Sequence, residues 1–128
     1  SHCEHHMAPI IGKAHVAYIS NGTVVGLSKM NRIVDYFAKR PQVQERLTLQ
    51  IIEELKKILN TENVACVIDA KHLCVNSRGI GDISSSTVTS EIGRRFKDKE
   101  IKREFLRLLN LLLTIMDSLN FTSSREMF

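Results

Sequence analysis

The sequence contains no tryptophan, and only 5% of its 128 residues are aromatic. Proteins that bind single-stranded nucleic acid commonly stack bases on aromatic side chains, so this shortage argues against such a role. The net charge of +4 is also weaker than the dense lysine and arginine clusters expected of a nucleic-acid-binding protein. A mildly basic protein suits an anionic small molecule instead.

Long apolar runs are lacking too, and none approaches the roughly 20 residues that a membrane-spanning helix needs. The only cysteines are Cys3, Cys66 and Cys74, and an odd, small number favours reduced thiols in the cytoplasm. With 43% hydrophobic residues, the chain predicts one globular domain over residues 1–120, followed by a frayed tail over residues 121–128.

The first half of the chain predicts a β-hairpin and two helices. Asn21-Gly22 favours a tight turn between strands at residues 12–20 and 23–27. A short helix over residues 28–40 follows, with Ser28 as its N-cap. Pro41 stops that helix and fits the first turn of a second one, where apolar residues recur every four positions. These are Val43, Leu47, Ile51 and Leu55.

The second half predicts two more strands, at residues 63–75 and 86–92, and a last helix starting near Asp98, which is a good N-cap. Apolar residues surround most of that helix, which indicates that it is buried, often against another subunit. The order is ββααββα. It predicts an α+β fold in which helices cover one face of an antiparallel sheet.

A metal site is suggested by Cys3-x-x-His6 together with Cys74. Two cysteines and one histidine can hold catalytic zinc and leave a fourth position for water. A closed structural zinc site remains the alternative, with His2, His5 or His72 as the fourth ligand. On a strand, His72 would point to the same side as Cys74 and could move protons there.

Two further groups of residues suggest a nucleotide. Ser28, Lys29 and Arg32 lie at the start of the first helix, where a phosphate would be stabilised, although a solvated basic turn is the simpler alternative. Arg78 could add a cation. Gln44-Glu45 begin the second helix, and a carboxylate there matches the paired N–H donors of a guanine edge, or is an ordinary first-turn acid.

Five blocks in this sequence resemble the zinc-dependent GTP cyclohydrolase I family in order and spacing. They are CEHH, GKAHVAYI, GLSK-x-x-RIV, RPQVQERLT and DAKHLCV-x-x-RGI, and the match runs from Ser1 to about Asn110. The resemblance implies the tunnelling fold, with active sites between the subunits of a homodecamer of two stacked pentamers.

The resemblance also implies a reaction, the hydrolysis of GTP to 7,8-dihydroneopterin triphosphate with release of formate, which opens pterin and tetrahydrofolate biosynthesis. A zinc-activated water would attack the purine C8 carbon. The implied roles are zinc ligation for Cys3, His6 and Cys74; proton transfer and later steps for His5, His72 and Ser28; triphosphate binding for Lys29, Arg32 and Arg78; and guanine recognition for Gln44 and Glu45.

One departure from the family pattern leaves alternatives open. Members carry an N-terminal helical segment before CEHH, so we expect this chain to be a fragment or a separated domain. It could then be a non-catalytic nucleotide-binding or assembly module with structural zinc. A third alternative is another tunnelling-fold purine or pterin enzyme. Such relatives commonly use three histidines, or a catalytic cysteine without zinc, so the set Cys3, His6 and Cys74 argues against this alternative.

Overall fold

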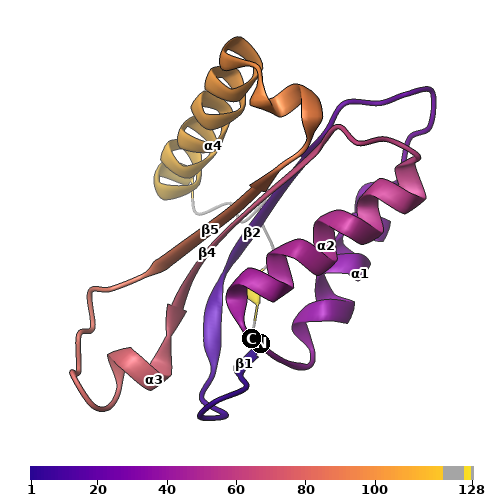
Figure 1. The fold of residues 1–128 in the computed structure, drawn as a ribbon. Helices are drawn as coiled ribbons and strands as arrows, with labels where there is room; N and C mark the ends of the chain where they lie inside the picture. Colours follow the sequence, from indigo (N-terminus) through magenta and orange to yellow (C-terminus); the bar gives the residue numbers. More distant parts are fainter. Residues whose placement is uncertain (120–125, 128) are drawn as a thin grey trace.

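The computed structural model describes the backbone of residues 1–119 and 126–127, and the side chains of residues 1–110 (Figure 1). Its elements, in chain order, are β1 (His2–Cys3), β2 (Ile10–Tyr18), α1 (Leu27–Ala38), β3 (Pro41–Gln42), α2 (Gln44–Leu59), β4 (Val64–His72), α3 (Leu73–Asn76), β5 (Thr87–Ile92), the 3-10 helix η1 (Arg94–Lys97), α4 (Lys99–Leu119) and β6 (Glu126–Met127). No helix in the described part of the chain is long and apolar enough to cross a membrane.

A four-stranded antiparallel sheet in the order β5-β4-β2-β6 organises the molecule. β2 and β4 pair along their full length, from Ile10 opposite His72 to Tyr18 opposite Val64. Residues near the end of β4 therefore lie beside residues near the start of the chain. The predicted α+β class and antiparallel sheet are confirmed.

The main core lies between this sheet and α2. Leu47, Ile51 and Leu55 recur every four residues along α2 and are fully buried. They belong to one apolar cluster with Val64, Cys66 and Ile68, the alternate residues of β4 that point to the same face. The apolar stripe predicted from the sequence is therefore the face that α2 buries.

A second, smaller core lies on the opposite face of the sheet. There Phe105 and Leu109 of α4 pack with Phe96 of η1 and with Ala65 of β4. Figure 1 shows α1 and α2 on one side of the sheet and α4 on the other, near one end. The expectation of helices on one face holds for α1 and α2, whereas α4 covers part of the second face. The apolar residues of α4 from Leu111 onward, and the expected frayed tail, lie outside the described side chains.

The predicted hairpin is wrong, because no strand follows β2 at residues 23–27. A two-residue hairpin turn needs positive φ at both central positions. Gly22 has φ of +86°, but Asn21 does not share it. β4 pairs along the whole of one edge of β2, whereas β6 pairs with the other edge only at Gly12 and Lys13. The hairpin is therefore missing because the backbone at Asn21-Gly22 does not form the turn that would bring residues 23–27 back to β2.

Three local boundaries also differ from the prediction. Gly26, not Ser28, is the N-cap of α1, and Ser28 lies inside the helix. Pro41 pairs with His2 in the short β1–β3 ladder instead of starting α2. Cys74 lies in α3 and not on a strand, because β4 ends at His72. Asp98 does cap α4 as predicted, since its Oδ1 accepts a hydrogen bond of 2.9 Å from the Glu100 backbone N–H.

Candidate metal centre

Two tight backbone segments bring the candidate metal ligands together. The turn after β1 is closed by hydrogen bonds from the Cys3 N–H to the Ala8 carbonyl (2.8 Å) and from the Met7 N–H to the Cys3 carbonyl (2.7 Å). The Leu73 N–H donates to the Pro9 carbonyl at 3.0 Å, which fixes α3 against this turn. As a result, Cys74 reaches the turn although it lies about 70 residues away in the sequence.

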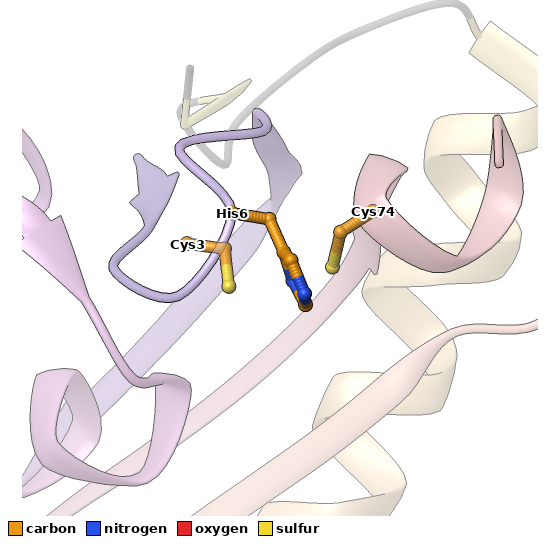
Figure 2. Close-up of side chains that lie close together, drawn as sticks. All are labelled: Cys3, His6 and Cys74. Carbon is orange, nitrogen blue, oxygen red and sulfur yellow. The ribbon is translucent and has the colours of Figure 1, made fainter. Parts of the chain in front are cut away.

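The ligating atoms of Cys3, His6 and Cys74 all lie within 4.8 Å of one another. Their side chains converge on a common point in Figure 2. Zinc binds sulfur at about 2.3 Å and nitrogen at about 2.0–2.1 Å, so two tetrahedral ligands of one ion lie about 3.6–3.8 Å apart. The donor types fit zinc, and the ligand atoms, within 4.8 Å of one another, would close by about 1 Å or less around the ion.

Three side chains, rather than four, form this cluster. Among the described residues, His2, His5 and His72 do not join it, so the closed structural site lacks the fourth ligand that it needs. The His5 ring lies edge-on to the His6 ring, with centroids 6.3 Å apart. A three-ligand site leaves one tetrahedral position for water or substrate, as catalytic zinc sites do.

The cluster combines a buried thiol with more accessible groups. Cys3 is only 7% exposed, Cys74 is half-buried and His6 is exposed. Burial raises the pKa of the Cys74 thiol, and the neighbouring Cys3 thiol raises it further, while the Arg78 guanidinium acts in the opposite direction. A cation held between the two sulfurs would favour their thiolate forms, which are the forms that ligate metal.

His72 and Gln44 form a second polar group, where β4 ends and α2 begins. His72 Nε2 lies 2.6 Å from Gln44 Oε1. Burial lowers the pKa of His72, and the nearby Glu45 carboxylate partly offsets this effect. Gln44 is 1% exposed and its amide bonds only to the protein interior, whereas Glu45 is exposed. Direct reading of a guanine edge therefore suits Glu45 and does not suit Gln44.

Two of the three cations predicted to bind phosphate, Lys29 and Arg32, lie in a different region. Lys29 and Arg32 line a groove of about 510 Å³ with Arg40, whose guanidinium stacks 4.6 Å above the Tyr36 ring. The Val25 N–H contacts the Tyr18 hydroxyl at 3.4 Å, so α1 starts beside the Tyr18 end of β2. Ile10 and the metal centre lie at the other end of that nine-residue strand, about 27 Å away. Within one chain, Ser28 and Lys29 are thus separated from the metal centre, whereas Arg78 lies near it.

An ion pair that sequence reasoning missed ties the metal-binding turn to α2. Arg46 Nη2 lies 2.6 Å from Glu4 Oε2, and the Glu4 N–H donates to the Gln42 carbonyl at 3.1 Å. Glu4 stands between the ligands Cys3 and His6, but nothing in the sequence pairs it with a residue 42 positions later.

We expect Glu4→Gln to weaken zinc binding by less than about fivefold, because exposed ion pairs contribute about 1 kcal/mol or less. The loss should shrink in high salt, which screens exposed charges. Competition with a zinc chelator at two salt concentrations measures it. Glu53→Gln, which removes an exposed pair with Lys56 on the same helix, is the matched control and should leave zinc affinity unchanged. A loss above about 100-fold would mean that Glu4 acts on the metal directly.

Cys66 should behave differently from the other two thiols. It is fully buried, and this burial raises its pKa to about 12. At pH 8 only about one molecule in ten thousand then carries the reactive thiolate. In the folded, zinc-free protein, iodoacetamide should label the half-buried Cys74 first, Cys3 (7% exposed) more slowly, and spare Cys66, as mass spectrometry of peptides would reveal. Labelling in denaturant is the control, since all three thiols should then react, and rapid native labelling of Cys66 would contradict its buried position.

Comparison with known proteins agrees with this geometry. A model of the GTP cyclohydrolase I family matches residues 1–110. The chain is 75% identical over 111 residues to GTP cyclohydrolase 1 of Flavobacterium johnsoniae, covering 87% of this chain and 50% of that protein. It is 56% identical over 108 residues to GTP cyclohydrolase 1 of Enterobacter sp. strain 638, covering 84% of this chain and 49% of that protein. The chain therefore spans about half the length of the curated relatives it matches.

Proposed function

We propose, from the premise that this chain belongs to the GTP cyclohydrolase I family, that it forms the zinc-binding part of an enzyme that hydrolyses GTP. The products would be 7,8-dihydroneopterin triphosphate and formate. The reaction would be the first step of tetrahydrofolate and pterin biosynthesis, in the cytoplasm. The observation that carries this proposal is the convergence of Cys3, His6 and Cys74 without a fourth ligand among the described residues. That arrangement favours catalytic over structural zinc.

The roles that we assign follow the chemistry and position of each side chain. The chemistry that zinc supplies when bound is activation of a water for attack on the purine C8 carbon. His5, exposed beside His6, would give a proton to the neighbouring imidazole nitrogen of guanine. Glu45 would accept the paired N–H groups of the guanine edge. His72 and Ser28 would serve the later opening and rearrangement of the ribose.

The triphosphate would be held by Lys29, Arg32 and Arg78, and such an active site would draw on more than one subunit. Within one chain, Lys29 and Cys74 lie near opposite ends of the sheet. No hydrogen bond or ion pair links these two residues in the described structure. A second copy that presents its α1 groove to the metal centre would complete the site. β5 is an edge strand of the described sheet, and Val88 on it is 61% exposed, so the sheets of neighbouring subunits have a surface at which to join. We therefore propose the homodecamer of two pentamers as the active form.

Turnover of GTP by the zinc-loaded, assembled protein tests the proposal. Formate should appear together with a product that carries the triphosphate, and ATP should give far less because its edge cannot donate the same pair of hydrogen bonds to Glu45. If a decameric, zinc-loaded sample binds GTP without releasing formate, the chain is a nucleotide-binding module instead.

A further inference from the structure

Gln44 stands at a buried junction between three elements. It is the first residue of α2, and its side-chain amide reaches the backbone of both β4 and β5. Its Nε2 lies 3.2 Å from the Ile68 carbonyl oxygen, 2.8 Å from the Thr87 carbonyl oxygen and 3.1 Å from Thr89 Oγ1. Its Oε1 lies 2.6 Å from His72 Nε2. Every polar atom of this side chain therefore has a partner.

The hydrogen-bond partners of Gln44 determine which end of its side-chain amide is the NH₂ group and which is the oxygen. Backbone carbonyl oxygens can only accept hydrogen bonds, so the end of the amide facing Ile68 and Thr87 must be the NH₂ group. The threonine hydroxyls complete a consistent set. Thr48 Oγ1 donates to the Gln44 carbonyl at 2.9 Å, so Thr89, 2.8 Å away, donates to Thr48 and accepts from Gln44. An amide flip would set the side-chain oxygen against two carbonyl oxygens.

With the amide orientation determined, Oε1 is available only as an acceptor toward His72. His72 Nε2 must then carry a proton, and in the neutral ring Nδ1 carries the lone pair. We propose that Gln44 is a positioning residue that holds neutral His72 in the Nε2–H form and leaves Nδ1 as the only proton-accepting atom of the ring.

This inference rests on the proposed function only where it concerns turnover. The Nε2–H group is committed to Gln44, so any proton that His72 exchanges with the substrate must pass through Nδ1. A mutation that stabilises the wrong tautomer of a catalytic histidine can lower kcat by about 10⁴-fold. A residue that selects the tautomer of His72 can therefore have a large effect on turnover.

Solid-state ¹⁵N NMR of the zinc-loaded protein with labelled histidine tests the tautomer without any turnover. The His72 signals are assigned by their loss in His72→Ala. We expect a protonated Nε2 and an unprotonated Nδ1 at a pH where the ring is neutral. A proton on Nδ1 overturns the proposal. Because this experiment needs no GTP, failure of the proposed function and failure of this inference are distinguishable.

Kinetics of Gln44→Met and Thr48→Val test the positioning role. Gln44→Met keeps the length of the side chain and removes the contact to His72. We expect kcat to fall on the order of 10- to 100-fold, as for other residues that orient a site group, while KM for GTP changes less than about threefold. Thr48→Val removes a hydroxyl of the same network that does not touch His72, so it controls for lost stability. Its kcat and its His72 tautomer should stay unchanged. Equal losses of kcat in the two variants, or none in Gln44→Met, would overturn the proposal.

Discussion

Replacement of Cys74 by serine is expected to remove zinc from the protein and to lower GTP hydrolysis by more than about 100-fold, the upper range found when even the outer-shell partners of a metal are lost. A serine hydroxyl stays protonated where a thiol gives up its proton to zinc, so only Cys3 and His6 would remain as ligands. Zinc content and formate release, measured on the same preparation, provide the test.

Cys66→Ala is the matched control for this experiment. Cys66 is buried between β4 and α2, away from the metal centre, and its replacement removes sulfur without removing a ligand. The control variant should lose some stability because of the cavity, but keep its zinc. If Cys74→Ser retained full zinc content and activity, Cys74 could not be a ligand and the assignment of the site would be wrong.

Replacement of Gly93 by alanine should strongly destabilise the fold. Gly93 crosses the start of β4, where its N–H donates to the Val64 carbonyl at 2.7 Å. A Cβ added there would lie 1.9 Å from the Glu62 carbonyl oxygen and 2.8 Å from that of Val64, both backbone atoms. Overpacking typically costs about 1–3 kcal/mol, and we expect this site to reach or exceed that range, because backbone must move. Urea unfolding at a constant protein concentration measures the loss.

Gly26→Ala tests the explanation for this loss. Gly26 has φ of −64° and ψ of 143°, which alanine also adopts, and a Cβ added there meets nothing within 4 Å. The unfolding free energy should change by less than about 1 kcal/mol, because a weaker N-cap and a less flexible unfolded chain act in opposite directions. Equal stability losses at Gly93 and Gly26 would show that flexibility, and not close contact, explains the need for glycine at position 93.

Patterns within one element were reliable guides to the fold. The four-residue apolar period of α2 identified the residues that it buries, and Asp98 was recognisable as a cap because a short polar side chain preceded a run of helix-forming residues. The strand over residues 86–92 was placed to within one residue. In each case the physical cause is local, so a few neighbouring residues are enough to reveal it.

Pairing between distant segments was less predictable. Asn21-Gly22 favours a hairpin locally, yet Asn21 does not adopt positive φ, and β2 pairs with β4 and β6, which are both remote in sequence. Cys74 was predicted on a strand because β-type residues continue past His72, but α3 begins at Leu73, where its N–H bonds to Pro9. Cys3, His6 and Cys74 nevertheless lie together as expected of candidate ligands, because their residue types and the family resemblance did not depend on that strand.

The surroundings of the metal centre required the structure. Gln44 and Glu45 are adjacent in sequence, but the helix turns one inward and the other toward solvent, so only the fold separates a buried positioning role from a binding role. The Glu4–Arg46 ion pair also required the structure, because nothing in the sequence pairs Glu4 with a residue 42 positions later. The separation of Lys29 from Cys74 along β2 also emerged only from strand pairing.

X-ray absorption at the zinc edge of the assembled, zinc-loaded protein tests the central claim most directly. The account predicts sulfur ligands at about 2.3 Å contributed by Cys3 and Cys74, together with nitrogen at about 2.0–2.1 Å from His6, and loss of part of the sulfur signal in Cys74→Ser. A zinc environment made only of nitrogen and oxygen, or one unchanged by Cys74→Ser, would contradict the claim that these three residues hold a catalytic metal.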